Sequence, residues 1–393
     1  MRATVTDLQE SCIREVANAG FGREDVLAFW FGESDEVTPQ FIRAAAIASL
    51  ERGETFYSHN LGLPGLREAI ARYMSALHGP IGVERLAVTS GGVIALMLVA
   101  QALIDPLDEV VAVTPIWPNL LAQPKIMGAR LRTVPLVPVA GAWTLDMDAL
   151  VHAVTARTRL LIINSPNNPS GWTLTRAEQQ RIVEHCRATG SWILADEVYE
   201  RLYYEAPAPA CAPSFLDVCD AHDRLVVVQS FSKSFLMTGW RLGWLVLPPA
   251  LAAQMGKLIE FNTSCAPVFV QRAAEAALGR SGEVISRVAT QLKHCRDTLV
   301  PLLQALPGVE VAPAPGGMYA FLRIAGQRDS LHVAKRLVAE AGLGLAPGMA
   351  FGIGDAQLQG CWLRWCFASR DPQRLVAGVQ RLGGWISGAG SCA

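Results

Sequence analysis

Residues 225–230 read Leu-Val-Val-Val-Gln-Ser, a short apolar run that ends in polar residues. Runs of the same kind recur along the chain, at residues 86–89, 110–113, 160–163, 192–195 and 242–247. They are continuously apolar rather than alternating, which is typical of strands buried on both faces in a mainly parallel sheet. The sequence therefore predicts an α/β fold in which helices cover both faces of such a sheet.

Polar residues follow several of these runs directly. Thr114, Asn164 and Asp196 each come immediately after an apolar run. In an open α/β sheet, ligands bind in the crevice at the carboxyl ends of the strands. We therefore expect a binding site along this edge of the predicted sheet.

The C-terminal part of the chain has a different pattern. Residues 251–306 have a helical pattern, 316–322 and 362–365 have the composition of strands, and 331–341 have that of a helix. A chain of 393 residues is too long for one ordinary core and suits two domains. We predict a large domain at 46–285, a smaller α+β domain at 286–393, and an N-terminal segment at 1–45 that contributes to the smaller domain.

Composition limits the classes of partner. The 34 basic residues nearly cancel the 35 acidic ones, so charge gives no reason to expect nucleic acid or an anionic membrane as partner. We expect a small-molecule ligand. The chain has no apolar run long enough for a membrane span and no signal-peptide pattern at its start. Its 9 cysteines form no metal-binding pattern, which favours free thiols in a reducing compartment. We therefore expect a soluble, cytoplasmic protein.

The strongest chemical signal is a lysine directly after the run at 225–230. Residues 230–243 read Ser-Phe-Ser-Lys-Ser-Phe-Leu-Met-Thr-Gly-Trp-Arg-Leu-Gly. A partly desolvated lysine such as Lys233 loses some of its preference for the charged form, and its neutral amine can form a Schiff base with an aldehyde. Ser230 and Arg241 offer a hydroxyl and a guanidinium, which are suitable donors for a phosphate.

This segment resembles the cofactor-lysine signature of the class I/II pyridoxal-phosphate (PLP) aminotransferases, of the aspartate aminotransferase superfamily with PLP fold type I. The resemblance rests on Ser-x-Ser-Lys followed by Gly-x-Arg-x-Gly at the expected spacing. It implies that Lys233 holds PLP. It also implies a large PLP-binding domain with a mainly parallel sheet of the seven-stranded type and helices on both faces, plus the smaller C-terminal domain.

Further motifs match the family in the same order along the chain. By this resemblance, Asp196 pairs with the pyridine nitrogen of PLP, while Tyr199 and Asn168 hydrogen-bond its phenolic oxygen. Gly92 and Val93 lie at a Gly-Gly turn before an expected helix, where backbone N–H groups can hold the phosphate. Trp117 would stack on the pyridine ring.

Three residues extend the resemblance to the substrate and to a second subunit. Arg364 aligns with the family's arginine for the substrate α-carboxylate, and an arginine among apolar neighbours needs such a partner. Gly32 aligns with the glycine whose backbone N–H helps to hold the same group. Tyr57 aligns with a tyrosine that reaches the phosphate of the neighbouring subunit, which implies a homodimer.

Together the motifs predict an aminotransferase that moves an amino group from an L-amino acid to a 2-oxo acid by a ping-pong mechanism. The uncharged Val93 and Ile94, with the apolar residues 27–31, favour a neutral, hydrophobic or aromatic donor. An arginine such as Arg14 or Arg23 would reverse this inference.

Three alternatives remain open on the sequence alone. A PLP-dependent carbon–sulfur β-lyase on the same fold shares nearly every motif, since fold does not settle the reaction. A non-catalytic PLP-binding regulator would carry a DNA-binding module ahead of the first motif, and Gly32 lies too near the start to leave room for one. A plain α/β protein with coincidental motifs would not bind PLP.

Overall fold

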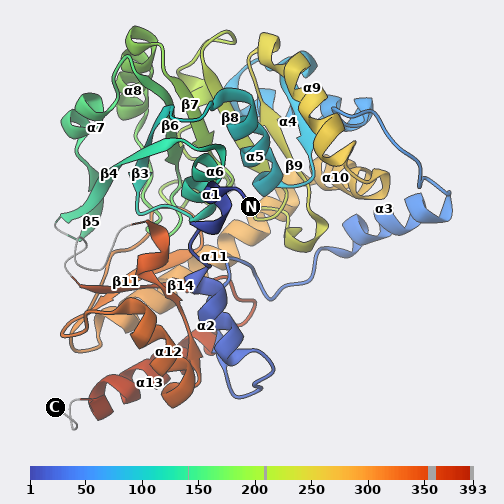
Figure 1. Ribbon diagram of the computed structural model, residues 1–393. Coiled ribbons are helices and arrows are strands. Elements are labelled where there is room, and N and C mark those ends of the chain that lie inside the picture. Colours follow the sequence, from blue (N-terminus) through green and yellow to red (C-terminus); the bar gives the residue numbers. More distant parts are fainter. Residues whose placement is uncertain (140, 208–209, 353–359, 390–393) are drawn as a thin grey trace.

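The computed structural model describes residues 1–139, 141–207, 210–352 and 360–389. Its upper part in Figure 1 is built on an eight-stranded sheet with the order β2-β9-β8-β7-β6-β3-β4-β5. The strands are β2 Leu86–Thr89, β3 Glu109–Thr114, β4 Arg130–Val139, β5 Ala142–Leu145, β6 Thr158–Asn164, β7 Trp192–Asp196, β8 Leu225–Ser230 and β9 Gly243–Val246. The six apolar runs therefore form strands, and the predicted α/β class is confirmed.

The central strands of this sheet are parallel. Strands β4, β3, β6, β7 and β8 pair in parallel, whereas β9 pairs antiparallel with both β8 and β2. The parallel strands β3, β6, β7 and β8 end at Thr114, Asn164, Asp196 and Ser230. These four polar residues consequently lie along one edge of the sheet, as expected.

Strands β4 and β5 were missed because their side chains alternate between exposed and buried positions. Strand β4 carries Arg130, Arg132, Pro135 and Pro138, and most of its residues are exposed. It pairs with β5 as an antiparallel hairpin at the margin of the sheet. A strand with one solvated face has no continuous apolar run, so it does not produce the pattern that revealed the others.

Helices cover both faces of the large sheet, as Figure 1 shows. Consecutive strand residues pack into two different cores: Val110 and Leu160 belong to one, and Val111 and Leu161 to the other. This alternation explains why the strands are apolar throughout. The helices of this part are α3 Gln40–Glu51, α4 Pro64–His78, α5 Gly92–Leu103, α6 Asn119–Met127, α7 Met147–Ala153, α8 Arg176–Thr189, α9 Pro249–Thr263 and α10 Val268–Gly279.

The smaller part of the molecule is built on an antiparallel sheet with the order β10-β11-β14-β13. Its strands are β10 Val309–Val311, β11 Tyr319–Ile324, β13 Ala346–Pro347 and β14 Cys361–Cys366, and its helices are α12 Ser330–Ala341 and α13 Pro372–Ala389. The long helix α11 (Ser281–Gln304) leads from the large part into this one. The smaller α+β part of the predicted fold is thereby confirmed.

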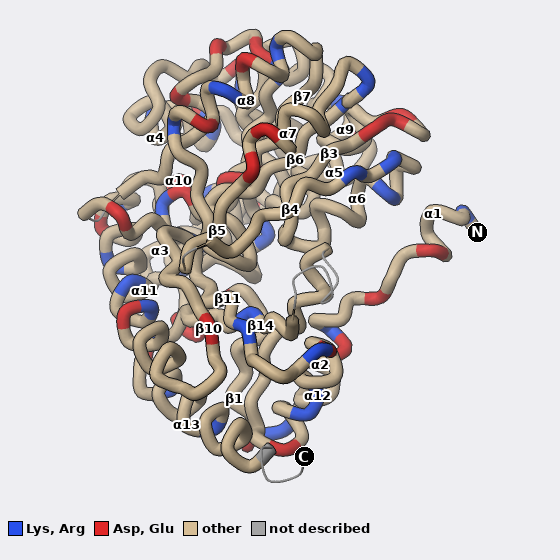
Figure 2. Tube along the Cα trace, turned by 90° about the vertical axis from the view of Figure 1, so that its left-hand side faces the viewer, with Lys and Arg blue, Asp and Glu red and all other residues tan. Residues whose placement is uncertain are grey.

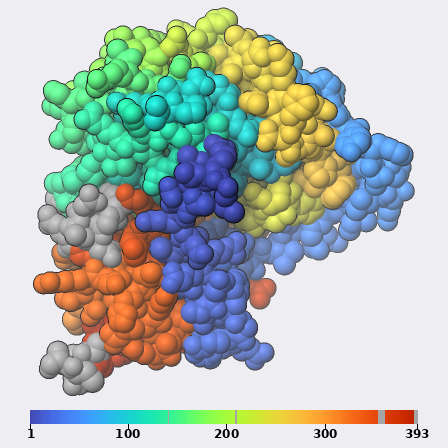
Figure 3. Space-filling model, viewed as in Figure 1, coloured from blue at the N-terminus to red at the C-terminus, as the bar shows by residue number. Residues whose placement is uncertain are grey.

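The N-terminal segment joins the two parts. Strand β1 (Leu27–Ala28) pairs in parallel with β12 (Leu343–Gly344), and α2 (Cys12–Gly20) packs against α12. Figure 3 shows the first residues, including α1 (Ala3–Thr6), running across the front from the small part to the large one. These contacts support placing the N-terminal segment with the smaller domain. The boundary at residue 45 lies within α3 and that at 285 within α11, and the domain limits stay a prediction.

Charge and cysteine usage fit the expectations from composition. Acidic and basic residues are interspersed along the chain trace in Figure 2. Of the eight cysteines in the described ranges, four are buried and four partly exposed, while Cys392 lies outside these ranges. None of the described helices combines the length and apolar character needed to cross a bilayer.

Candidate active site

A cavity of about 740 Å³ opens at the carboxyl ends of the parallel strands, between the large sheet and the small one. Every residue that the sequence predicted for the site lines this cavity except Tyr57: Gly32, Gly92, Val93, Trp117, Asn168, Asp196, Tyr199, Ser230, Lys233, Arg241 and Arg364. The fold therefore gathers residues separated by more than 300 positions into one place. The individual roles assigned to them stay predictions.

Lys233 lies in the turn that follows β8, with its amine inside the cavity. Its Nζ donates a hydrogen bond to the Gly32 carbonyl oxygen at 2.6 Å. Burial lowers the pKa of Lys233 to about 8, and the Arg364 guanidinium acts in the same direction. A substantial fraction of the amine is therefore neutral near pH 7–8, which is the form that attacks a carbonyl carbon.

Asp196 ends β7 and is fully enclosed by protein. Its Oδ1 accepts a hydrogen bond from the Val198 backbone N–H at 3.3 Å, and no ion pair joins it to a described residue. Burial raises the pKa of Asp196 to about 7. A buried carboxylate without a cationic partner is costly, so this position suits a ligand that brings its own N–H⁺.

Two buried tyrosines form the side of the cavity towards the small sheet. The hydroxyl of Tyr199 is 2.7 Å from that of Tyr319, and the rings meet edge to face with centroids 5.7 Å apart. The sequence interpretation missed Tyr319. In the sequence, Tyr319 is a tyrosine within an apolar strand pattern that follows Gly316-Gly317. A tyrosine of the hydrophobic core gives the same pattern.

Gly32 is required by the close approach of Tyr319. A Cβ atom at position 32 would lie 2.0 Å from the Tyr319 hydroxyl oxygen. The glycine thus lets the N-terminal segment run close enough for its carbonyl to meet Lys233. A side chain there would displace either the tyrosine or the segment.

Arg364 lies on β14 of the small sheet and reaches across to the large one. It is 2% exposed, its Nη1 donates to Asn168 Oδ1 at 3.0 Å, and its Nη2 donates to the Trp30 carbonyl oxygen. Its Nε is buried and has no hydrogen-bond partner among the described residues. An open N–H on a buried guanidinium in a cavity wall fits an arriving carboxylate.

The turn that carries Asn168 is fixed to the end of β7. The side chain of Asn164 accepts a hydrogen bond from the Asn168 N–H at 2.7 Å and donates to the Asp196 carbonyl oxygen at 3.0 Å. Asn164 itself lines the cavity, although the sequence reading assigned it no role. It ties the positions of Asn168 and Asp196 together.

The opposite end of the cavity is built for an anion. Helix α5 begins at Gly92, and its N-cap residue Gly91 provides no side-chain cap. The first backbone N–H groups of such a helix have no partner within it. Gly91 has φ +99°, and a Cβ atom there would lie 2.6 Å from Arg241 Nη2, so the guanidinium rests against this turn. Ser230 lines the same region, and together these donors offer a cradle that a phosphate would fit.

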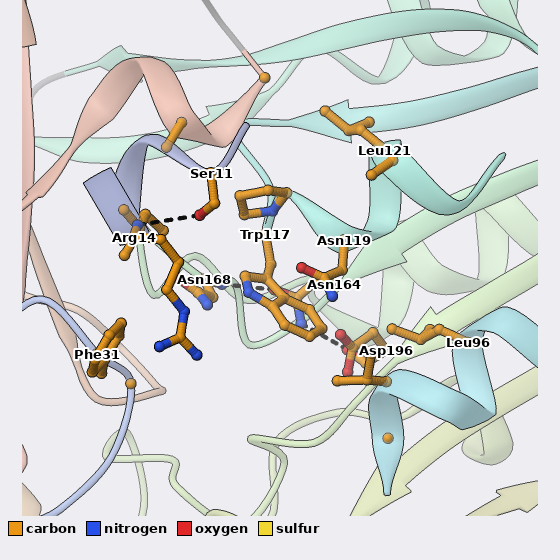
Figure 4. Close-up of a pocket in the computed structure, with 18 of the residues that line it drawn as sticks. Ser11, Arg14, Phe31, Leu96, Trp117, Asn119, Leu121, Asn164, Asn168 and Asp196 are labelled. Carbon is orange, nitrogen blue, oxygen red and sulfur yellow. Dashed lines mark hydrogen bonds between the residues drawn. The ribbon is translucent and has the colours of Figure 1, made fainter. Parts of the chain in front are cut away.

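Trp117 follows β3 and projects into the cavity from the large sheet. In the view of Figure 4 its indole lies between Asp196 on one side and Asn168 and Arg14 on the other. A flat ring bound in the cavity against the indole would have an apolar partner on the face that it turns towards Trp117. The stacking role of Trp117 stays a prediction.

Tyr57 lies outside the cavity. It is 90% exposed, and the neighbouring Phe56 is 83% exposed. A single chain therefore gives this tyrosine no partner group for the role that the sequence predicted. The role predicted for Tyr57 in a second subunit stays a prediction.

The described geometry fits PLP at each end. Asp196 offers a carboxylate for a ring nitrogen, Lys233 an amine for an aldehyde, and the start of α5 with Arg241 a cradle for a phosphate. The aminotransferase class I and II family pattern matches residues 26–382 of this chain. The chain belongs to the class I and II aminotransferases. It is thus a PLP-dependent transaminase, as the sequence predicted.

Individual relatives agree with this assignment. A probable aspartate/prephenate aminotransferase of Aquifex aeolicus is 32% identical over 365 residues, covering 91% of this chain and 90% of the relative. An aromatic-amino-acid aminotransferase of Thermococcus litoralis is 30% identical, covering 86% and 87%. The solved aspartate aminotransferase of Thermus thermophilus with maleate superposes on this transaminase with a TM-score of 0.89, 28% identity and 98% coverage of both chains.

Proposed function

We propose that this transaminase moves the amino group of a neutral, hydrophobic or aromatic L-amino acid to a 2-oxo acid in two successive half-reactions. The observation that carries the proposal is the single cavity in which Lys233, Asp196 and Arg364 converge. When bound, PLP supplies an aldehyde that links to amines and a protonated ring that draws electrons from the substrate Cα. The second substrate reverses the steps of the first, which gives a ping-pong scheme.

The chain's own residues have distinct tasks in this proposal. Arg364 holds the substrate α-carboxylate, with the Gly32 backbone beside it. Lys233 would hold the cofactor at rest, then take the proton from the substrate Cα as general base and return it, as general acid, at the former aldehyde carbon of the cofactor. Asp196 keeps the ring nitrogen protonated. Tyr199 and Asn168 stay close to the phenolic oxygen of the ring.

The substrate preference rests on apolar residues in the cavity wall. Val93, Phe31 and Trp117 give this wall apolar surface. Relatives named as aromatic-amino-acid and as aspartate aminotransferases show that both kinds of donor occur among similar proteins. The apolar lining supports an aromatic or other apolar amino acid as the donor.

The test of this function is a spectral titration of the purified, PLP-loaded protein with single amino acids in the absence of any oxo acid. Transamination converts the cofactor to its amine form, with loss of the yellow colour and release of a 2-oxo acid. We expect phenylalanine and leucine to cause this change at lower concentrations than glycine or lysine. Release of ammonia and pyruvate from a cysteine conjugate with the colour retained would instead identify a β-lyase, which the relatives do not favour.

A second substrate class is favoured by Arg14. This residue of α2 lines the cavity, and Figure 4 shows its side chain directed into it. Its guanidinium lies 4.7 Å from the Phe31 ring centroid. The Thermus thermophilus relative was solved with maleate, a dicarboxylate. We infer that Arg14 receives the distal carboxylate of a dicarboxylic substrate, which suits an acidic 2-oxo acid as amino acceptor.

Replacing Arg14 with glutamine is expected to lower kcat/KM for aspartate and 2-oxoglutarate by about 10-fold or more, because one charge-assisted hydrogen bond is lost. The value for phenylalanine should change little. The control is Arg23→Gln, since Arg23 is paired with Asp25 and does not line the cavity. An equal loss of kcat/KM for acidic and for aromatic substrates would contradict the role assigned to Arg14.

Replacing Arg364 with lysine is expected to raise KM for every amino acid by about 10- to 100-fold, because a guanidinium that holds a carboxylate with two donors is replaced by a point charge. The absorbance of bound PLP should not change. Arg323→Lys on the neighbouring strand is the control, since Arg323 pairs with Glu310 at the surface. An unchanged KM would show that another group holds the α-carboxylate.

We also propose that the active unit is a homodimer in the cytoplasm. Phe56, Tyr57 and Phe261 are each more than 80% exposed, and the Ser58 N–H donates to Cys265 Sγ at 3.4 Å, so the two segments lie side by side. Large exposed aromatic side chains that gather in one region are typical of an interface. A second copy covering this region would bring Tyr57 to its neighbour's phosphate cradle.

Tyr57→Phe is accordingly expected to weaken PLP binding by about 10-fold, because one hydrogen bond to a charged phosphate is lost. The molar mass measured by light scattering should remain that of a dimer. Tyr203→Phe, which removes a tyrosine hydroxyl away from the cavity, should leave PLP affinity unchanged. A monomeric mass for the active wild-type protein would refute the role of Tyr57.

A further inference from the structure

A cluster of metal-ligating side chains lies apart from the catalytic cavity. It consists of His78, the last residue of α4, Glu200, in the turn after β7, and Cys211. One ligand atom from each residue lies within 4.8 Å of the other two. None of the three lines the described part of the catalytic cavity.

The separations of these atoms are those of a small coordination sphere. His78 Nε2 is 3.2 Å from Glu200 Oε2 and 4.0 Å from Cys211 Sγ. Zinc binds nitrogen and oxygen at about 2.0–2.2 Å and sulfur at about 2.3 Å in tetrahedral geometry, which places neighbouring ligand atoms about 3.3–3.6 Å apart. The two distances from His78 Nε2 need to change by only a few tenths of an ångström to accept the ion, and the Glu200 and Cys211 ligand atoms lie within 4.8 Å of each other.

The imidazole is oriented for this task. Asp217 Oδ1 lies 2.8 Å from His78 Nδ1, and Arg176 in turn pairs with Asp217 at 3.2 Å. A carboxylate on one ring nitrogen fixes the tautomer that leaves the other nitrogen free to ligate a metal, and such pairs are usual behind zinc-bound histidines. The Nε2 atom consequently faces Glu200 and Cys211.

The backbone around the cluster is also held in place. The Ala212 N–H donates to the Glu200 carbonyl oxygen at 2.8 Å, and Arg201 Nε donates to the Ala210 carbonyl oxygen at 3.1 Å. The side chains of His78 and Glu200 are only 1% and 3% exposed. The ligand atoms are therefore positioned before any ion arrives, which reduces the ordering cost of binding.

We propose that His78, Glu200 and Cys211 form a zinc site with a water molecule in the fourth position and Asp217 as the orienting carboxylate. Thiolate, imidazole and carboxylate together favour zinc over magnesium or calcium, which take oxygen ligands. The ion would clamp the end of α4 to the turn after β7. That turn directly follows Asp196 and carries Tyr199, so the site would stabilise the cavity wall without entering the reaction.

The experiment uses the full-length, PLP-loaded protein after treatment with a chelator and dialysis. Zinc chloride is titrated calorimetrically, and bound metal is measured by elemental analysis. Cobalt(II) serves as a spectroscopic probe, since tetrahedral coordination gives strong visible bands at longer wavelength than PLP absorption. We expect one equivalent of zinc and the tetrahedral cobalt spectrum.

Variants identify the ligands. Cys211→Ser is expected to weaken zinc binding by about 100-fold or more, and Asp217→Asn by about 10- to 100-fold, the usual effect of losing an orienting carboxylate. Cys219→Ser is the matched control, because Cys219 is a partly exposed free thiol outside the cluster. His78→Gln supplies a second ligand variant if one of the others fails to fold.

Two results would overturn the proposal. One is the absence of stoichiometric zinc or cobalt binding by the wild-type protein. The other is a Cys211→Ser protein that binds zinc as tightly as the Cys219→Ser control. Amino-transfer activity is measured separately, and we expect it to persist when the chelated protein is assayed at low temperature, so the zinc site and the proposed function are tested independently.

Discussion

Replacing Lys233 with alanine is expected to lower the rate of amino transfer by about 10⁴-fold or more. The residue combines the nucleophile that holds the cofactor with the general acid and base of the proton transfer, and the second of these roles alone is worth about 10²- to 10⁴-fold. Its burial, its pKa near 8 and its position beside Gly32 support both roles. The measurement is the single-turnover rate of cofactor conversion with phenylalanine.

The matched control for this variant is Lys257→Ala. Lys257 is a surface residue of α9 whose Nζ donates to Gln254 Oε1 at 2.9 Å, so its loss should leave the rate unchanged. Added methylamine should restore part of the lost rate in the Lys233→Ala protein, since a small amine can enter the space left behind. A Lys233→Ala protein with wild-type turnover would refute the assignment of this residue.

Asp196→Asn is expected to lower the rate by about 10²- to 10³-fold. The amide has nearly the same shape as the carboxylate but cannot pair with a protonated ring nitrogen, so an electrostatic contribution is lost without a change in packing. The measurement is again the single-turnover rate, at saturating PLP. Asp148→Asn, at an exposed position, is the control. A rate within twofold of wild type would show that the ring nitrogen needs no anionic partner here.

The same variant should change how stability depends on pH in the cofactor-free protein. The pKa of Asp196 is raised by burial from 3.8 to about 7. Between these values the folded protein keeps a proton that the unfolded chain has released, so this group makes the free energy of unfolding fall as the pH rises from about 4 to about 7. Urea unfolding should show a shallower fall for Asp196→Asn than for wild type. An identical pH dependence would contradict the raised pKa.

The sequence predicted those strands of the large sheet that are buried on both faces. Strands such as β6 and β8 pack both faces into a core, which leaves a continuous apolar run that is easily recognised. Strand β4 could not be found in this way, because its exposed face carries arginines and prolines. Strand β4 was therefore missed because one of its faces is exposed to solvent, and not because it is a weak strand.

The sequence predicted those site residues that directly follow an apolar run or belong to a recognisable motif. Asp196 and Lys233 come directly after apolar runs, so their position in the sheet places them in the cavity. Tyr319 and Arg14 come from the small sheet and from α2, and they reach the cavity only through the packing of the two parts. Such a tertiary arrangement leaves no local signal that distinguishes Tyr319 from a core tyrosine, and for Arg14 only the presence of a charge.

Residues 7–14 line the cavity although they belong to none of the strands that carry Lys233 and Asp196. If Arg14 selects substrates as proposed, the groups proposed for bond-making and for selectivity are encoded in separate stretches of the gene. A library of variants confined to residues 7–14 could therefore explore new amino acid substrates while the reactive centre is left intact. Natural diversification of such transaminases could follow the same route, with short changes at the start of the chain redirecting an unchanged chemistry.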